Sequence, residues 1–168
     1  MKLRKKMKRS EHSKRVFWVA STGGHLRQLL GLSALYGNYD SHIFTEKTGS
    51  TIALKDRYEN RMHYFVFGSR VHMIPYLFKF AFNCIKSLLY FFRFMPDYVI
   101  TTGTHTAVPL CVIASVFHRK VIYIETRSSF SKITKAGQLV YRIADLFVIQ
   151  RPSLQLLVPN AVLCEVEE

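Results

Sequence analysis

The sequence predicts an α/β fold: a Rossmann-like parallel sheet flanked by helices. Short runs of β-branched and aromatic residues recur along the 168-residue chain, and stretches with helical period lie between most of them. Strands that alternate with helices form a parallel sheet covered on both faces. Gly, Ser, Thr, His and Glu residues follow the first five runs, which is where an open parallel sheet binds its ligands. We therefore expect a basic arm over residues 1–15 and a single domain over residues 16–168.

Seven strands and four helices are expected along the chain, with no internal repeat and no long linker. The strands are the β-branched and aromatic runs Val16–Ala20, His42–Thr45, Met62–Phe67, Tyr98–Thr101, Val121–Glu125, Leu146–Ile149 and Ala161–Val166. The helices are the stretches with apolar residues at helical spacing, Gly24–Tyr36, Ile74–Phe94, Thr106–Phe117 and Lys132–Ala144.

The chain is strongly basic, with a formal net charge of +13 that is concentrated in the arm. The basic residues there are Lys2, Arg4, Lys5, Lys6, Lys8, Arg9, Lys14 and Arg15, with only Glu11 against them. Such an arm binds nucleic acid or an anionic membrane surface, or is a solvated tail. Because the apolar run that follows, Val16–Ala20, is shorter than the roughly 7–15 residues of a secretory signal core, we expect the protein to stay in the cytosol.

The three cysteines indicate neither a disulfide framework nor a metal site. Cys84, Cys111 and Cys164 are odd in number, widely separated and without Cys-x-x-Cys or Cys/His spacing. We expect free thiols in apolar surroundings, no metal and no cofactor.

The segment STGGHLRQLL turns directly from the first strand into a helix and predicts an anion site. Glycines let the backbone approach a ligand, and the first amides of a helix favour a phosphate. Thr22, Gly23 and Gly24 are therefore expected to bind a phosphate group. The segment lacks the Gly-x-Gly-x-x-Gly and Gly-Lys-Ser/Thr patterns of dinucleotide folds and P-loops. A dinucleotide alternative stays open because Glu46 follows the second strand, where a ribose-binding acid would lie.

His25 opens the same helix, and a second glycine and histidine segment, TTGTHTAVP, follows the fourth strand. The positive end of a helix dipole favours a neutral imidazole, so His25 is a candidate general base, or else a residue that merely caps the turn. Gly103, Thr104 and His105 repeat the pattern of the first loop. Two such turns on neighbouring strands could together hold a diphosphate.

Two further charged residues follow strands. Glu125 ends the fifth strand and could orient a sugar hydroxyl or a histidine, or act as a base; the alternatives are a salt bridge to Arg127 and a helix cap. Arg70, after Gly68 and Ser69, is a further candidate for anion contact.

The stretch IPYLFKFAFNCIKSLLYFFRF, Ile74–Phe94, is long enough to span a bilayer. Three cations recur in it every seven residues on one helical stripe, and a span would divide the sheet between two sides of the membrane. We expect a helix that lies in the membrane interface; the alternative is an ordinary helix packed on the sheet with its basic stripe in water. The expected membrane contacts are Lys79, Phe82, Lys86, Phe91 and Arg93.

These segments, in this order, resemble the Alg14 family, including its bacterial polysaccharide-biosynthesis members. They resemble more distantly the amino-terminal half of the GT-B glycosyltransferase that adds GlcNAc to the lipid-linked muramyl peptide of cell-wall synthesis. The resemblance covers nearly all of the chain after the arm and rests on STGGHL, the helix near Ile74–Phe94, TTGTHTAVP, YIETRSS and VPNAVL.

The resemblance implies the N-terminal, acceptor-binding domain of a GT-B glycosyltransferase and assigns Gly23, Gly24, His25, Gly103, Thr104 and His105 to the diphosphate and sugar of a polyprenyl-diphosphate-linked acceptor. In Alg14-type systems the nucleotide-sugar half is a separate polypeptide, so an Alg13-like partner that holds the UDP-sugar is expected. His25, or Glu125 alone or through His105, would take the acceptor proton.

The implied function is that of a membrane-associated subunit of a split, inverting UDP-sugar glycosyltransferase, active only with its partner. It would extend a lipid-linked saccharide in capsular or exopolysaccharide synthesis at the cytoplasmic face of the cell membrane, as a peripheral or monotopic protein. A non-catalytic recruiter of a complete transferase is the alternative. Nucleic-acid binding rests on charge alone and is not expected.

Overall fold

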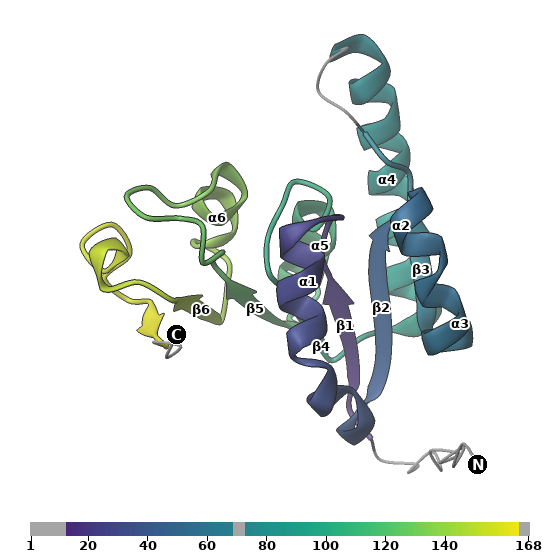
Figure 1. Cartoon of the computed structure of the whole chain (residues 1–168), viewed down its shortest axis with the longest axis horizontal. Helices are drawn as coiled ribbons and strands as arrows, with labels where there is room; N and C mark the ends of the chain where they lie inside the picture. The colour runs from purple at the N-terminus through teal and green to yellow at the C-terminus, as the bar shows by residue number, and fades with distance from the viewer. Residues whose placement is uncertain (1–12, 69–72, 165–168) are drawn as a thin grey trace.

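The computed structural model describes residues 13–68 and 73–164, and its frame is one seven-stranded parallel sheet (Figure 1). The strand order is β3-β2-β1-β4-β5-β6-β7, and every neighbouring pair is parallel. The strands are β1 (Arg15–Val19), β2 (Asp40–Glu46), β3 (Met62–Phe65), β4 (Tyr98–Thr101), β5 (Lys120–Ile124), β6 (Leu146–Ile149) and β7 (Val162–Leu163). The predicted fold class, a helix-flanked Rossmann-like parallel sheet, is confirmed.

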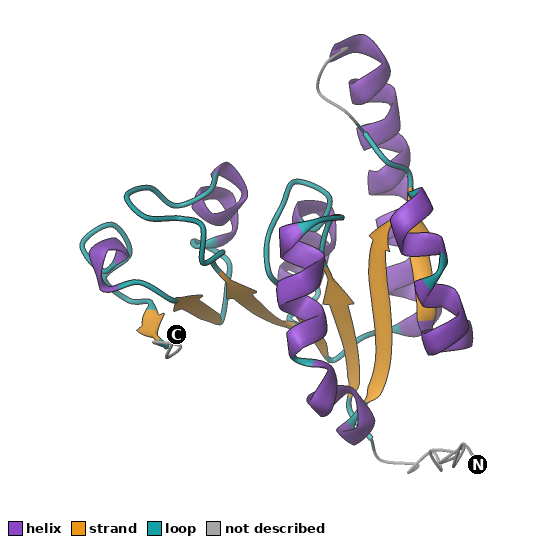
Figure 2. Cartoon of the chain, in the orientation of Figure 1, coloured by secondary structure: helices purple, strands orange, loops and turns teal. Residues whose placement is uncertain are grey.

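Helices cover both faces of the sheet (Figures 1 and 2). They are α1 (Gly24–Gly31), α2 (Gly49–Ile52), α3 (Leu54–Tyr58), α4 (Met73–Phe94), α5 (Val108–Val116) and α6 (Lys135–Val140). Single 3₁₀ segments are formed by Ser33–Asn38, Glu59–Arg61 and Pro152–Leu154. In the views, α1, α2 and α3 lie in front of the sheet, and α4 and α5 lie behind it.

Alternating side chains of the buried strands supply one apolar layer to each face. In β1, Phe17 and Val19 face the α4 and α5 side, whereas Val16 and Trp18 face the α1 side. All four are at most 2% exposed, which is expected of a parallel strand covered on both faces. Trp18 also donates its indole N–H to Ser41 Oγ at 3.0 Å, so the polar atom of this buried ring is paired.

Local differences from the predicted elements have physical causes. The predicted helix Gly24–Tyr36 stops at Gly31 and continues as a 3₁₀ segment, in which the Tyr36 hydroxyl donates to the carbonyl of Leu29 at 2.8 Å. The short helices α2 and α3 were not predicted, because a stretch of four or five residues shows no periodicity. The last predicted strand reduces to β7 within the described residues.

Most of the basic arm lies outside the described residues, but its last member belongs to the sheet. Arg15 begins β1, and its guanidinium Nε lies 2.8 Å from Asp40 Oδ2. Its backbone N–H also donates to the carboxylate of Asp97 at 2.9 Å. Arg15 is therefore a structural residue at the start of β1 and not part of a free arm.

Helix α4 packs on the sheet through polar residues as well as through Phe91, which corrects the expected division into one apolar and one cationic face. The side-chain amide of Asn83 accepts from the backbone N–H of Val66 and donates to the carbonyl of Val66, at 2.8 and 2.9 Å. Lys86 donates to the carbonyl of Tyr64 at 2.6 Å, and Ser87 is fully buried. Asn83 thus continues the ladder of the edge strand β3, so part of the polar stripe points inward.

The expected membrane contacts divide accordingly. Phe91 is fully buried and packs on Phe117 with a centroid distance of 5.2 Å, so its assignment to the membrane is wrong. Lys86 is half-buried against the sheet. Phe82 is 51% exposed, and Lys79 and Arg93 are exposed. The period of seven predicts one stripe, and within that stripe Lys86 contacts the sheet whereas Lys79 and Arg93 are exposed.

The outward face of α4 is apolar over almost its whole length. Within the residues that the structure describes, no helix is long and apolar enough to cross a membrane. The N-terminal half of α4 projects past the carboxyl ends of the strands (Figure 1). The exposed side chains, 43–75% accessible, are Ile74, Leu77, Phe78, Phe82, Ile85, Leu88, Leu89 and Phe92.

Candidate functional site

The candidate site lies at the carboxyl ends of β1, β2 and β4. The chain leaves β1 toward β2 on one side of the sheet, and β4 begins the other side, so β1 and β4 flank the topological switch point. Ligands of open α/β sheets bind in the crevice at such a point. Both glycine and histidine loops of the sequence follow these two strands.

His25 joins the first loop to the second. Its Nδ1 lies 2.7 Å from the carbonyl oxygen of Thr102, and the Thr102 hydroxyl donates to the backbone carbonyl of His25 at 2.8 Å. A carbonyl can only accept, so Nδ1 carries a proton, and in the neutral ring Nε2 is left as the proton acceptor. The two loops are therefore in direct contact through two hydrogen bonds, of which the bond from Nδ1 orients the imidazole.

The second loop has a backbone that side chains rarely adopt. Gly103 has φ of 108°, and a Cβ placed on it would lie 2.9 Å from the Tyr123 hydroxyl and 3.3 Å from the His25 ring. Thr104 has φ of 87°, an outlier for a β-branched residue. Its Oγ1 is buried and has no hydrogen-bond partner among the described residues. Strain of this kind concentrates at binding and catalytic sites.

The buried carboxylate of Glu46 contacts residues of both the first and the second loop. It ends β2, is 3% exposed and accepts a hydrogen bond from the Thr106 hydroxyl at 2.7 Å. The backbone N–H of Thr22 also donates to this carboxylate. Burial raises the pKa of Glu46, and the hydrogen bonds from Thr106 and Thr22 partly oppose that rise. Sequence reasoning gave Glu46 only a dinucleotide role, although its place after a strand was the available signal.

His105 lies between this carboxylate and helix α4. Its Nε2 is 4.0 Å from Glu46 Oε1, and the side chain is 27% exposed. From α4, the rings of Tyr76 and Phe80 approach the imidazole with centroid distances of 5.4 and 6.5 Å. The site therefore adjoins the end of α4 whose outer face is apolar.

Glu125 is not placed to act as a base, which corrects that expectation. Its side chain is fully buried. Oε1 accepts from the Thr126 amide and the Ser129 hydroxyl at 3.0 and 3.1 Å, and Oε2 accepts from the amide and hydroxyl of Thr134, both at 3.1 Å. Because Thr134 caps α6 through the Gly137 amide, Glu125 holds the loop before that helix.

The remaining predicted residues divide into those that the structure describes and those outside the described residues. Gly23 has φ of 85° and, with Gly24, forms the exposed start of α1, which has no side-chain cap. Arg70 lies outside the described residues, and so does Ser69. Tyr123 was not predicted, yet it lies under Gly103 and its hydroxyl is 2.9 Å from Thr134 Oγ1.

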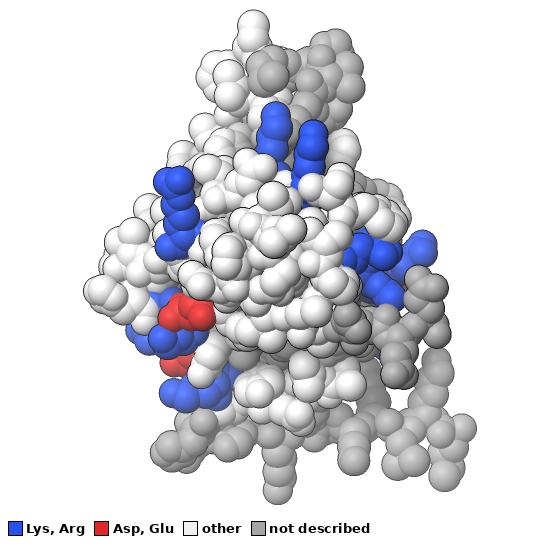
Figure 3. Space-filling model, turned by 90° about the vertical axis from the view of Figure 1, so that its left-hand side faces the viewer, with Lys and Arg blue, Asp and Glu red and all other residues white. Residues whose placement is uncertain are grey.

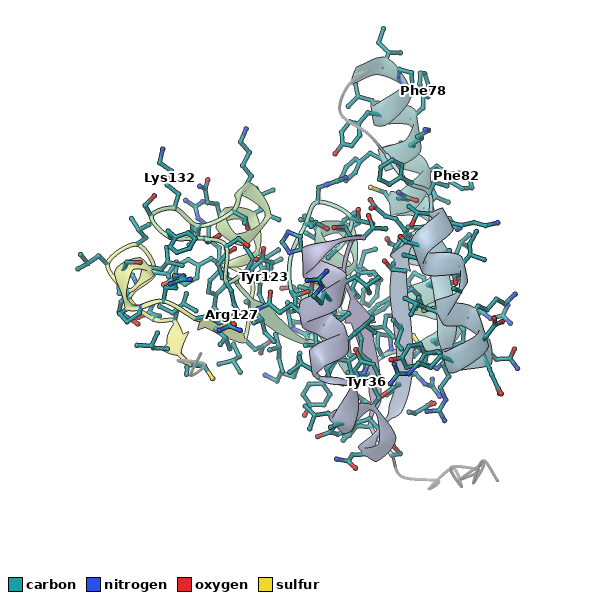
Figure 4. All side chains as sticks on the ribbon, viewed as in Figure 1. Tyr36, Phe78, Phe82, Tyr123, Arg127 and Lys132 are labelled. Carbon is teal, nitrogen blue, oxygen red and sulfur yellow. The ribbon has the colours of Figure 1, made fainter. Side chains whose placement is uncertain are left out.

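Charged side chains are sparse on the face at the β6–β7 end of the sheet. From that side, Lys and Arg lie toward the margins of a broad uncharged surface (Figure 3). Arg127 and Lys132 belong to the loop between β5 and α6, and Figure 4 shows Lys132 directed away from the sheet. Among the described residues, no group of His, Cys, Asp and Glu is arranged to hold a metal ion.

Comparison with known sequences identifies a family. Residues 52–164 match the family described as "Oligosaccharide biosynthesis protein Alg14 like". The chain is 32% identical over 76 residues to the UDP-N-acetylglucosamine transferase subunit ALG14 of Homo sapiens. That alignment covers 42% of this chain and 35% of the human protein, so the chain matches about a third of the length of this relative.

Solved structures share the fold. MurG from Acinetobacter baumannii superposes with a TM-score of 0.67 and 19% identity, over 83% of this chain and 42% of MurG. A UDP-GlcNAc 2-epimerase from Methanocaldococcus jannaschii gives 0.65 and 17%, over 86% of this chain and 42% of the epimerase. At such identities the likeness concerns the fold alone, which is that of a GT-B N-terminal-like domain.

Proposed function

This chain belongs to the Alg14-like family of oligosaccharide biosynthesis proteins, as the motifs predicted, and from that membership we propose that it is the acceptor-binding subunit of a split glycosyltransferase. The subunit binds a polyprenyl-diphosphate-linked saccharide, and an Alg13-like partner supplies the UDP-sugar. Because the human relative is a UDP-N-acetylglucosamine transferase subunit, UDP-GlcNAc is the first donor to test. Polysaccharide synthesis is the proposed setting.

The observation that carries the proposal is the contact between the two glycine loops at the switch point. Gly23 and Gly24 are exposed at the uncapped start of α1, where backbone amides and the positive end of the helix dipole can meet an anion. The Gly103 N–H instead donates to the Thr101 hydroxyl at 3.0 Å, so Gly103 contributes the shape of the second loop. A diphosphate has the charge and size to engage both loops at once. His25 and His105 are the titratable side chains that the loops bring to it.

In the proposed reaction His25 is the general base. The hydrogen bond from Nδ1 to the Thr102 carbonyl leaves Nε2 of the neutral ring free to accept the proton of the acceptor hydroxyl. That hydroxyl attacks the anomeric carbon of the donor, and UDP leaves on the partner. Thr102 positions the base, and Gly103 allows the ring and the loop to approach each other.

Helix α4 is the proposed membrane contact. The exposed apolar residues of α4 follow one another along the helix and are not scattered singly over the surface. A contiguous apolar surface of this kind marks an interaction site. Phe78 and Phe82 lie on the projecting part of the helix (Figure 4). Because Tyr76 and Phe80 of the same helix flank His105, a lipid-linked acceptor could pass from the bilayer to the site without leaving an apolar path.

The expected loss on changing His25 tests the function. Transfer of labelled GlcNAc from UDP-GlcNAc to a lipid-linked acceptor is measured in membranes that contain this chain, its partner, or both. Product should require both chains. His25→Asn keeps a donor for the Thr102 carbonyl but removes the base, so the rate should fall by about 10²–10⁴.

His118→Asn is the matched control, because His118 is exposed, and asparagine tolerates its φ of 53°. It should leave the rate unchanged. Product from the partner alone, merely enhanced by this chain and indifferent to His25, would instead make the chain a recruiter.

Membrane contact through α4 is tested with vesicles of anionic lipid. The double variant Phe78→Ser and Phe82→Ser removes two exposed rings without touching the buried face of the helix. Sedimentation with vesicles should fall by about tenfold or more, because burying one such ring is worth roughly 1.5–3 kcal/mol. Leu35→Ser is the control, since Leu35 is 44% exposed on another element. Equal losses in both variants, or in neither, would contradict the assignment.

A further inference from the structure

Glu46 is a carboxylate that the proposed reaction does not yet use. It is 3% exposed and receives hydrogen bonds from the Thr106 hydroxyl and the Thr22 amide, which belong to different loops. Its place is therefore at the junction of the two loops that form the proposed diphosphate site.

A buried carboxylate that only connected the two loops would carry a high desolvation cost. Removing it from water disfavours the charged form, and burial does raise the pKa of Glu46. A neutral glutamine could accept the same two hydrogen bonds with a smaller desolvation cost. A buried carboxylate needs a charge partner, and the imidazole of His105, with Nε2 at 4.0 Å from Oε1, is placed to be one when it is protonated.

The two members of this pair differ in exposure. Glu46 is 3% exposed and His105 is 27% exposed, so the carboxylate lies inside and the imidazole lies toward the surface. Tyr76 and Phe80 hold the imidazole from the α4 side. A protonated His105 paired in this way is neutral with Glu46 as a whole, yet it presents the positive end of the pair to an incoming anion.

We propose that Glu46 is a positioning residue that acts through His105, presenting its imidazolium to the diphosphate of the acceptor. This inference rests on the proposed function, because it takes the diphosphate as the ligand of the two loops. The dinucleotide role that the sequence left open for Glu46 is not needed, since its carboxylate is occupied by Thr106 and Thr22.

The test measures binding of farnesyl diphosphate to the full chain, with farnesol as the uncharged probe. Wild type should bind the diphosphate more tightly than farnesol. Glu46→Gln should weaken the diphosphate about tenfold and leave farnesol unchanged. In the transfer assay the same variant should raise the KM for the acceptor more than it lowers kcat, because the interaction acts on a bound anion. Loss of folded protein would lower the apparent kcat with KM unchanged.

A double-mutant cycle separates action through His105 from a structural effect. Once His105→Gln has removed the imidazole, Glu46→Gln should cost little further affinity, whereas additive losses would overturn the inference. Glu59→Gln, at an exposed glutamate, is the matched control. Wild-type affinity in Glu46→Gln would also overturn the inference and leave the proposed function standing. Failure of the wild type to bind the diphosphate would overturn the proposed function itself.

Discussion

Replacing Gly103 by alanine is expected to abolish acceptor binding and to lower the free energy of unfolding by about 2–4 kcal/mol. The new Cβ would lie 2.9 Å from the Tyr123 hydroxyl and 3.3 Å from Cε1 and Nδ1 of His25. The φ of 108° adds backbone strain for any L side chain. Tyr123 is fully buried beneath the loop, so relief requires movement of the loop or of His25. Either movement breaks the bond between His25 and Thr102.

Chemical denaturation and farnesyl diphosphate binding are measured on the same Gly103→Ala preparation. Gly31→Ala is the matched control, because Gly31 ends α1, has no positive φ, and a Cβ added to it would meet no atom within 4 Å. It should be neutral or stabilise the protein by up to about 1 kcal/mol. A Gly103→Ala protein with wild-type stability and binding would show that the approach of His25 to this loop is dispensable.

Glu125→Ala is expected to destabilise the protein by about 3–5 kcal/mol, because it leaves buried donors without an acceptor. Gly137→Ala is expected to cost at least about 3 kcal/mol for a related reason: its Cβ would lie 2.3 Å from Glu125 Oε2. The two effects share one atom, so they should not add. In the Glu125→Ala background, Gly137→Ala should cost about 1–3 kcal/mol less than in the wild type.

Because the Glu125 carboxylate holds the loop before α6, stability and transfer activity should fall together in Glu125→Ala. Gly49→Ala, with no atom within 4 Å of its Cβ, is the control for the glycine change. Additive costs in the two backgrounds would mean that Gly137 and Glu125 do not share this contact.

Much of the fold was predictable because parallel strands carry a strong local signal. The run Tyr98–Thr101 was predicted with its observed bounds, and the runs at β1 and β5 were each displaced by one residue. The predicted strand boundaries differ by a residue because contacts with neighbouring segments determine where a strand begins. Arg15 belongs to β1 because it contacts the side chains of Asp40 and Asp97. Helices α2 and α3 escaped prediction because neither is long enough to display a period.

The candidate site was predictable in its residue types but not in its connections. Glycine and histidine after two strands indicated an anion site, and both loops do meet. Glu125 and Glu46 both follow a strand in the sequence, and no local pattern distinguishes the roles they take. Hydrogen bonds from distant residues separate them, since Thr134 reaches Glu125 and Thr106 reaches Glu46.

By itself the sequence determined the parallel α/β fold, the family and the two loops, because each depends on residue types at short spacing along the chain. Tertiary structure alone decided that Phe91 lies in the core, that Asn83 and Lys86 of α4 face the edge strand and that Glu46 contacts both loops. Helical period defines a stripe but not its direction. The direction of the stripe depends on which backbone groups of the sheet need a hydrogen-bond partner. Here the backbone N–H and carbonyl of Val66, just after β3, pair with the side-chain amide of Asn83.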